Sequence, residues 1–396
     1  MLRILIADKV SPRTVSALKA LGAEVTMNAE LSAKDLPGAI GDANVLIVRS
    51  TEVTADTLKA GQSLEVVIRA GAGVNTIDLD QASRLGIAVA NCPGKNTDAV
   101  AELALGLLIA ADRRIVDASL DLRQGRWRKK EYGKAAGLKD RTLGLVGLGS
   151  IGQAMIKRAQ GLEMNVVGWS RSLTPERAEA LGIGYCKTLE DLAVISDAVS
   201  VHLAKTAETS KLLGAAFFGK MKNGAIFVNT ARGEVVDAAA LKDAIASKKL
   251  RVGLDVFAKE PEGGDCAFEQ AELAALVSGT PHIGASTDQA SEAIADEVVF
   301  IVKSLVETGK PLHTVNIRGP ASSDITLLVR HYNRVGVLAS VLDLLREENI
   351  NVEEMENIIF NGNAAAMACL KLDHSPSAAV LSAIAAYDAV IQVSVK

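Results

Sequence analysis

One stretch of this sequence is the most informative about its architecture: Thr142-Leu143-Gly144-Leu145-Val146-Gly147-Leu148-Gly149-Ser150-Ile151-Gly152. It reads as an apolar strand, a turn with glycines in G-x-G-x-x-G spacing, and the start of a helix. In that context Gly147 permits the tight turn, Gly149 lets a pyrophosphate approach the backbone, and Gly152 lets the helix pack close to the strand. The N–H groups at the helix N-terminus then face the phosphates. The stretch therefore predicts an α/β unit that binds a dinucleotide.

Short apolar runs alternate with helical segments on both sides of this stretch, which is typical of parallel sheets covered by helices on both faces. We expect two α/β lobes of Rossmann-like or flavodoxin-like type. A helical region over 98–124 joins the lobes, and a helix over 288–308 returns to the first lobe. The first lobe has predicted strands at 2–7, 23–27, 44–48, 64–68 and 87–90, and the second at 142–147, 165–169, 183–186, 198–203, 225–229 and 252–256.

The last seventy residues differ in pattern from the rest of the chain. They read strand, helix, strand, strand, helix, strand, which is the ferredoxin-like βαββαβ order. The residues before them, Arg-Gly-Pro-Ala-Ser-Ser-Asp, have the composition of a linker. The predicted domains are a discontinuous substrate-binding domain (1–97 and 287–317), a dinucleotide-binding domain (98–286), a linker (318–324) and a C-terminal regulatory domain (325–396).

Composition excludes several classes of protein. The 396 residues carry 43 Lys and Arg against 47 Asp and Glu, and a nucleic-acid binder usually has a basic excess. The longest apolar run, 103–111, is shorter than the ~20 residues of a membrane span, and the start shows no signal-peptide pattern. Four widely spaced cysteines form no metal-ligand pattern. We therefore expect a cytoplasmic protein with reduced structural thiols, no metal site, and neither nucleic acid nor membrane as a partner.

The residue that reads the adenosine ribose is expected where the next strand ends, about 20 residues after the glycines. That strand ends in Trp169-Ser170-Arg171, without the acidic side chain that would bind the ribose 2′-hydroxyl and repel a 2′-phosphate. Arg171 supplies a cation that a 2′-phosphate would attract. The pair favours NADP or the use of both coenzymes, unless Arg171 points into solvent and NAD binds through other contacts.

Three polar residues follow later strands of the second lobe. Arg232 lies in Asn-Thr-Ala-Arg-Gly, Glu260 in Asp-Val-Phe-Ala-Lys-Glu-Pro, and His282 in Thr-Pro-His-Ile-Gly. Open α/β sheets place ligands at the edge where such residues meet. Oxidation of an alcohol needs a base with a pKa near neutrality, and histidine meets that need. A carboxylate such as Glu260 would orient the imidazole, and Arg232 could bind a substrate carboxylate through two hydrogen bonds.

The order G-x-G-x-x-G, T-A-R-G, D-V-F-x-x-E-P, P-H-x-G-A-S-T resembles the D-isomer-specific 2-hydroxyacid dehydrogenases, from residue 3 to about residue 317. The resemblance implies NAD as the usual cofactor, Arg232 as substrate binder, Glu260 as the histidine's partner and His282 as the acid/base. It also implies cofactor contacts from Ser150, Ile151, Thr230, Ala231, Asp255, Gly284 and Ala285. The sequence departs from the family at Ser170, where an acid is usual.

Three further stretches, at 48–51, 68–75 and 125–130, resemble the members of that family that oxidise 3-phosphoglycerate, the first step of the phosphorylated route to L-serine. A phosphorylated acid needs several cations, and Arg49, Arg69 and Lys130 are candidates. Gly71 and Gly73 follow Arg69 in a loop whose N–H groups could face an anion. The resemblance adds Ser50 to this expected substrate site, while the charge run around Lys130 is equally consistent with a solvated surface.

The C-terminal residues resemble an ACT domain, a ligand-sensing module. The resemblance implies L-serine as an effector at His331, Asn333 and Asn351, whose imidazole and amide groups can hydrogen-bond an amino acid. It also implies a homodimer or homotetramer, since such sites form between two copies. The usual Pro before Gly336 is Val335 here.

Two other functions remain open at this point. An NADP-linked glyoxylate or hydroxypyruvate reductase is suggested by Ser170 and Arg171, although an unphosphorylated acid needs fewer cations. A non-catalytic dinucleotide-sensing protein could keep the glycine motif, but it would need a groove for a partner peptide, and the sequence indicates none.

Overall fold

The computed structural model describes residues 1–261, 266–319 and 324–396, and contacts between residues divide the chain into two units, Met1–Asn316 and Ile317–Lys396. Most of the predicted linker at 318–324 falls on residues 320–323, outside the described part. No helix in the described part is long and apolar enough to cross a membrane.

The first sheet contains five parallel strands in the order β2-β1-β3-β4-β5, which is the flavodoxin-like order. Its strands are buried on both sides because α1 and α14 cover one face while α2, α3 and α4 cover the other. The elements are β1 (Arg3–Ile6), α1 (Pro12–Ala20), β2 (Glu24–Met27), α2 (Leu36–Ala39), β3 (Val45–Val48), α3 (Ala55–Ala60), β4 (Val66–Arg69), α4 (Leu79–Arg84) and β5 (Ala88–Asn91). The five predicted strands are confirmed.

The predicted continuous helical region over 98–124 is wrong in one respect. It consists of α5 (Thr97–Arg113) and α6 (Ile115–Arg123), which meet at Arg114. Arg114 has left-handed backbone angles, φ 51° and ψ 45°, which an α-helix of L-residues cannot continue through. Its side chain binds Asp117 and Glu131 at 3.2 and 2.7 Å, which fixes the start of α6.

We call residues 114–136 the arm; it includes α6 and α7 (Lys129–Tyr132). The buried carboxylate of Asp121 holds it together by accepting hydrogen bonds from Tyr132, Arg126 and Arg128. The bond from the Tyr132 hydroxyl, followed by the pairing with Arg126, lowers the pKa of Asp121 to about 2. Apolar side chains of the arm remain exposed: Ile115, Val116, Leu120, Leu122 and Trp127.

The second sheet contains seven parallel strands in the order β12-β11-β10-β9-β6-β7-β8. The six predicted strands are confirmed, and β12 is a short addition that the sequence pattern did not predict. The strands are β6 (Thr142–Val146), β7 (Asn165–Trp169), β8 (Gly184–Tyr185), β9 (Ala198–Val201), β10 (Ile226–Asn229), β11 (Arg251–Leu254) and β12 (Ser278–Gly279). The helices are α8 (Ser150–Gly161), α9 (Pro175–Ala180), α10 (Leu189–Ile195), α11 (Ala215–Lys220), the 3-10 turn η1 (Gly233–Val235), α12 (Ala238–Lys248) and α13 (Ala271–Ala274).

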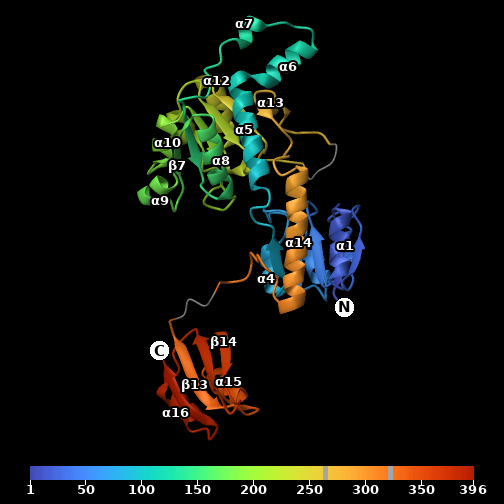
Figure 1. Ribbon diagram of the computed structural model, residues 1–396, viewed down its shortest axis with the longest axis vertical. Helices are drawn as coiled ribbons and strands as arrows, with labels where there is room; N and C mark the ends of the chain where they lie inside the picture. The colour runs from blue at the N-terminus through green and yellow to red at the C-terminus, as the bar shows by residue number, and fades with distance from the viewer. Residues whose placement is uncertain (262–265, 320–323) are drawn as a thin grey trace. The chain divides into compact units, whose positions relative to one another are not determined.

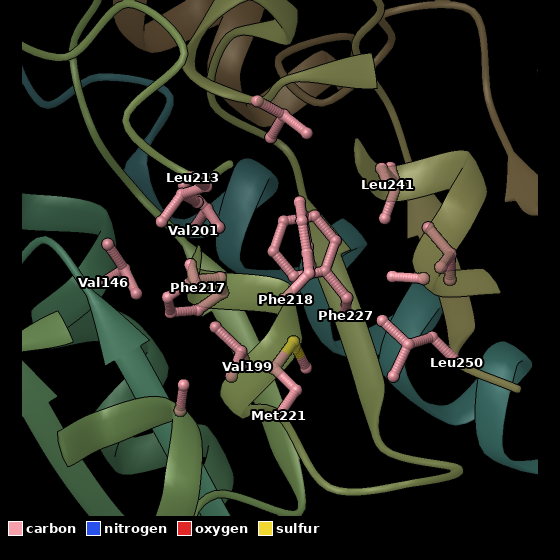
Figure 2. Close-up of a cluster of buried hydrophobic side chains, with 14 of the residues drawn as sticks. Val146, Val199, Val201, Leu213, Phe217, Phe218, Met221, Phe227, Leu241 and Leu250 are labelled. Atoms are coloured by element: carbon pink, nitrogen blue, oxygen red, sulfur yellow. The ribbon is translucent and has the colours of Figure 1, made fainter. Parts of the chain in front are cut away.

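Hydrophobic cores lie on both faces of the second sheet, and Figure 2 shows part of one of them. Phe218 packs edge-to-face against Phe217 and Phe227, with ring centroids 5.5 and 5.1 Å apart. Burial raises the pKa of the Cys186 thiol in this core to about 11, and that of Cys92 in the first lobe to about 12. These two thiols are therefore protonated and unreactive near neutral pH, as expected for structural cysteines.

Helix α14 (Asp288–Thr308) returns to the first lobe and packs on its sheet, as Figure 1 shows. The chain then adds a short antiparallel pairing to β5, with Thr314 opposite Ala90. The buried carboxylate of Glu297 on α14 binds two side chains at 2.8 Å each: Lys95, between β5 and α5, and His313, in the segment that leaves the unit.

The unit Ile317–Lys396 has the predicted βαββαβ order and a four-stranded antiparallel sheet, β14-β15-β13-β16, which confirms the ferredoxin-like fold. Both helices contribute to a core on one face of the sheet. The elements are β13 (Thr326–Tyr332), α15 (Val337–Glu347), β14 (Val352–Ile359), β15 (Ala365–Leu372), α16 (Ala378–Ala385) and β16 (Val390–Val395).

Candidate active site

A cavity of about 320 Å³ lies where the two lobes of the first unit meet. Residues after β4 form one wall, and residues after β10, β11 and β12 form the others. It brings together five residues singled out from the sequence: Arg69, Gly73, Arg232, Glu260 and His282. Its remaining lining consists of Asn75, Thr76, Glu234, Phe257, Ala258 and Lys259.

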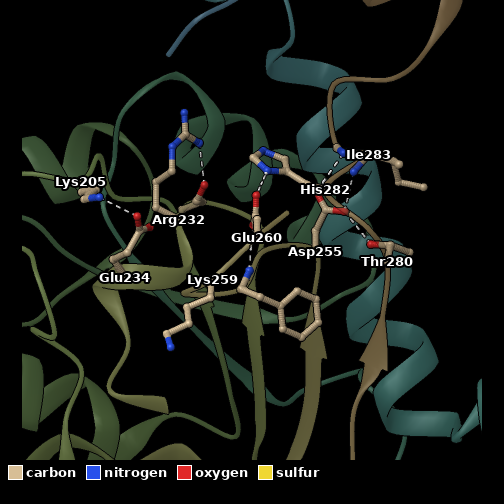
Figure 3. A network of polar contacts seen from close by, with 12 residues as sticks. Lys205, Arg232, Glu234, Asp255, Lys259, Glu260, Thr280, His282 and Ile283 are labelled. Carbon is tan, nitrogen blue, oxygen red and sulfur yellow. Dashed lines mark hydrogen bonds and ion pairs between the residues drawn. The ribbon is translucent and has the colours of Figure 1, made fainter. Parts of the chain in front are cut away.

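The imidazole of His282 is held by a carboxylate. Its Nδ1 lies 2.5 Å from Oε2 of Glu260, while Oε1 of Glu260 accepts the backbone N–H of Phe257 at 2.8 Å (Figure 3). The Phe257 bond fixes the carboxylate, and the carboxylate fixes the ring. Because Nδ1 is engaged with Glu260, Nε2 is the nitrogen left to exchange a proton with a substrate hydroxyl.

The turn that carries His282 is organised by Asp255, at the end of β11. Its carboxylate accepts hydrogen bonds from the Thr280 hydroxyl (2.6 Å) and from the N–H groups of Ile283 (2.8 Å) and Gly284 (2.9 Å). Burial raises the pKa of Asp255, and these bonds oppose the shift. Both oxygens of Asp255 thus hold the His282 turn, and the cofactor contact that the resemblance implies for Asp255 stays a prediction.

Arg232 is presented by a turn that Asn229 stabilises. The Asn229 amide accepts the N–H of Ala231 and donates to the carbonyl of Arg232, both at 2.9 Å. The guanidinium of Arg232 then lies against Gly73, where a Cβ would overlap it. Likewise, the guanidinium of Arg69 lies against Gly71, which has φ +156° and no room for a Cβ. The glycines of this loop therefore leave the space that the two guanidinium groups occupy.

Two neighbouring cations make this part of the cavity strongly positive. Burial lowers the pKa of Arg69, and the charges of Arg232 and Arg49 lower it further. The Nε of Arg69 is buried without a hydrogen-bond partner. An anion in the cavity would offset this repulsion and offer the missing acceptor.

Four expected substrate residues do not line this cavity: Arg49, Ser50, Gly71 and Lys130. Gly71 lies against the guanidinium of Arg69. Arg49 lines a different crevice in the first lobe, although it is close enough to affect the pKa of Arg69. The N–H of Ser50 is bound by Asp8, whose carboxylate also accepts the N–H groups of Arg49 and Thr51. Lys130 lies on the arm and lines a separate pocket with Arg114 and Glu131.

The glycine motif has the geometry of a phosphate-binding turn. Gly147 has φ +95°, and a Cβ there would overlap the carbonyl of His202; a Cβ at Gly152 would overlap the carbonyl of Gly147. A Cβ at Gly149 would meet nothing within 4 Å, so open space remains in front of the turn. Helix α8 begins there without a side-chain cap, which leaves its first N–H groups free for an anion. These residues fit the pyrophosphate of a dinucleotide.

The other expected cofactor residues also lie around the carboxyl edge of the second sheet. Ser170 and Arg171 directly follow β7, and Arg171 is exposed. Thr230 and Ala231 follow β10 and are buried, and Oγ1 of Thr230 has no hydrogen-bond partner. Ala285 follows Gly284 in the turn held by Asp255. Buried hydroxyls are normally hydrogen-bonded, so this one fits a site that binds a polar ligand.

Sequence reasoning missed several residues of the cavity. Asn75 and Thr76 continue the Gly71–Gly73 loop, and that proximity was a usable signal. Glu234 forms an ion pair with Lys205 at 2.6 Å (Figure 3), a contact between distant segments that no spacing rule indicates.

The three expected effector residues do not share one cavity within the C-terminal unit. His331 is buried and contacts Asn357 at 3.3 Å, while Asn333 donates to the carbonyl of Asn363 at 3.1 Å. Asn351 lines a separate hollow of about 450 Å³ next to α15.

Comparisons with known proteins agree with this geometry. The family pattern described as "D-isomer specific 2-hydroxyacid dehydrogenase, NAD binding domain" matches residues 105–284. The chain is 35% identical over 349 residues to D-3-phosphoglycerate dehydrogenase of Archaeoglobus fulgidus. This match covers 86% of this chain and 64% of the relative. The chain thus spans somewhat less than two thirds of that relative's length.

Two further similarities concern shorter proteins. The chain is 40% identical over 279 residues to hydroxypyruvate reductase of Thermotoga maritima, covering 70% of this chain and 89% of the relative. The NAD⁺-bound structure of 3-phosphoglycerate dehydrogenase from Entamoeba histolytica has a TM-score of 0.67 and 26% identity, and the match covers 80% of this chain and 99% of that one.

Proposed function

The chain belongs to the D-isomer-specific 2-hydroxyacid dehydrogenase family, and on that premise we propose that it oxidises 3-phospho-D-glycerate to 3-phosphohydroxypyruvate. This reaction opens the phosphorylated route to L-serine, and we propose that it takes place in the cytoplasm. When bound at the glycine turn, a nicotinamide dinucleotide supplies the carbon that accepts the hydride from C2 of the substrate.

The residues of the cavity carry out the proton transfer and bind the substrate. Nε2 of His282 removes the proton of the C2 hydroxyl, and Glu260 stabilises the imidazolium that forms. Arg232 binds the substrate carboxylate, because its guanidinium lies in the same cavity as the imidazole and is fixed by the Asn229 turn. Arg69 binds the phosphate from the opposite wall.

The observation that carries the choice of substrate is the second arginine. A 2-hydroxyacid with one carboxylate needs one guanidinium, and here Arg69 stands with Arg232 in one cavity, with a depressed pKa and an unpartnered Nε. That arrangement favours a substrate with two anionic groups. The first relatives by similarity, named D-3-phosphoglycerate dehydrogenases, support the same choice.

A reductase of unphosphorylated hydroxypyruvate is the second candidate, because the Thermotoga maritima relative of that name matches over most of its length. A substrate panel separates the two: 3-phosphoglycerate, D-glycerate and hydroxypyruvate, each with both coenzymes. We expect the highest kcat/KM for the phosphorylated substrate. A higher value for glycerate or hydroxypyruvate would select the reductase, and no turnover with any of them would favour a dinucleotide sensor.

We further propose that the chain forms a homodimer or homotetramer through the arm. Its exposed apolar side chains, among them Trp127 at 81% exposure, support this because a group of exposed apolar side chains on one segment indicates a contact surface. Light scattering of the full chain should give a multiple of 41.4 kDa, whereas a monomer would contradict the proposal.

Regulation by L-serine at the C-terminal unit is the last part of the proposal, with His331, Asn333 and Asn351 as the binding residues. The amide groups of Asn333 and Asn351 are on exposed residues, where they can meet an amino acid held between two copies. Calorimetry should detect L-serine binding that Asn333→Ala removes. No heat at millimolar serine would assign the unit to assembly or to another effector.

A further inference from the structure

The first sheet has a second place where its order predicts a ligand. In open α/β sheets, ligands bind outside the carboxyl ends of the strands at the point where successive connections change to the opposite face. In the order β2-β1-β3-β4-β5 that point lies between β1 and β3, since β1 leads to α1 on one face and β3 leads to α3 on the other. The active-site cavity uses residues after β4 and leaves this point free.

A crevice of about 430 Å³ is present there, within the ordinary size range of small-molecule sites. Its walls are the segment after β1, the start of α1, Arg49 after β3, Ala70 after β4, and the first turns of α14. Figure 1 shows α1 and α14 side by side over this face of the sheet. Its apolar floor comes from buried residues: Ala70, Ile294 and Val298.

The charges of the crevice select the kind of ligand. Lys9 and Arg49 lie on the side of the sheet, and Asp288 and Glu292 lie on α14. No ion pair or side-chain hydrogen bond engages any of these four within the described ranges, so they are not paired with one another either. A simple anion would meet two carboxylates and a simple cation would meet two basic groups. A molecule with one group of each sign satisfies both walls.

One polar group beneath the crevice also lacks a partner. The side chain of Thr14, on α1, lines the crevice and is 2% exposed, and its Oγ1 makes no hydrogen bond. An unsatisfied buried hydroxyl is unfavourable and rare in folded proteins. An occupant that reaches the floor would give Oγ1 the partner it lacks.

We propose that this crevice binds a small zwitterion, an α-amino acid, with its carboxylate at Lys9 and Arg49 and its ammonium at Asp288 and Glu292. The ammonium would face α14 and the side chain would lie over Ala70, Ile294 and Val298, which favours a short apolar side chain. Binding here is independent of the reaction at His282, so the test reads binding and stands even if the proposed substrate is wrong.

The test uses the full chain and a panel of the proteinogenic L-amino acids, each at millimolar concentration, by thermal shift and then calorimetry. Acetate and ethylammonium, which carry one charge each, are the matched ligands. We expect at least one amino acid to bind, with each single-charge ligand at least tenfold weaker. Acetate binding as well as the amino acid, or no amino acid binding at all, would overturn the proposal.

Two nearly isosteric variants locate the binding. Glu292→Gln removes one charge and Thr14→Val removes the hydroxyl, and each should weaken binding about tenfold or more. Lys303→Gln, on an exposed part of α14, should leave binding unchanged. Binding that survives both variants but disappears in Asn333→Ala belongs to the C-terminal unit and would overturn the assignment to this crevice.

Discussion

The two parallel sheets of the first unit build their polar sites in different ways. At the carboxyl edge of the second sheet, the backbone does most of the work: three glycines shape the turn before α8, and Asp255 holds the His282 turn through two N–H groups. At the edge of the first sheet, the basic side chains Lys9, Arg49 and Arg69 project from the strand ends or from the residues just after them. A site built from the backbone tolerates few substitutions, but its glycine spacing can be recognised in the sequence. A site built from charged side chains has no such recognisable spacing.

The first test of this comparison addresses the imidazole that the second sheet positions. His282→Ala should lower turnover about 10²–10⁴-fold, the usual contribution of a general acid/base, while dinucleotide affinity is retained. Steady-state kinetics and a dinucleotide titration measure the two effects. Glu260→Gln, which keeps a hydrogen bond to Nδ1 but loses the charge, should fall between the wild type and His282→Ala. Turnover above half of the wild-type value would rule out His282 as the base.

The second test addresses the glycine turn itself. Gly152→Val places side-chain atoms on the carbonyl of Gly147 and should move the turn, with a loss of about 10²-fold in kcat/KM, as for misplacements near 1 Å. The matched control is Gly161→Ala on the same helix, where an added Cβ meets nothing within 4 Å. Equal effects of the two substitutions would mean that the turn is not sterically constrained.

The third test addresses the site built from charged side chains. Arg69→Gln should weaken 3-phosphoglycerate about 10- to 100-fold, since a hydrogen bond to a charged group contributes ~1.5–3 kcal/mol, and should affect D-glycerate much less. The ratio of kcat/KM for the two substrates measures the phosphate contribution alone. A similar loss for both would show that Arg69 maintains the cavity rather than recognising the phosphate.

The fourth and smallest effect concerns coenzyme choice. Ser170→Asp should shift the ratio of kcat/KM for NAD over NADP several-fold toward NAD, because a carboxylate there repels a 2′-phosphate. Arg171 is exposed. Hydrogen bonds, first the one from the Thr206 hydroxyl, lower the pKa of Glu208, and the charge of Arg171 adds a smaller effect, so an acidic side chain lies within electrostatic range of Arg171. An unchanged ratio would mean that neither residue reaches the adenosine ribose.

The same difference explains what could be predicted from the sequence. Strand positions and the glycine turn follow from hydrophobic period and spacing, so β6, β7 and α14 lie within a residue of their predicted bounds. The break at Arg114 could not be predicted, because no glycine or proline marks it and the contacts of Arg114 with Asp117 and Glu131 are visible only in the folded chain.

The basic residues expected to bind the substrate show the same limit on prediction from sequence. Arg69 and Arg232 meet because Gly71 and Gly73 give them room, and those glycines were visible in the sequence. Arg49 has no such glycine neighbours and Lys130 lies in a run of charges, and both line other hollows of the described structure. The sequence shows that a residue is basic, and only the folded structure shows which cavity its side chain lines.

The carboxylate of Glu297 has a mechanical consequence. It holds Lys95 on one crossing between the lobes, lies on the helix that follows the other crossing, and holds His313 on the segment leading out of the unit. Glu297 is buried, and leaving its carboxylate without partners is unfavourable, so the two contacts hold these three segments together. The residues that lead to the C-terminal unit are therefore tied, through one carboxylate, to α14 and to the segment between β5 and α5.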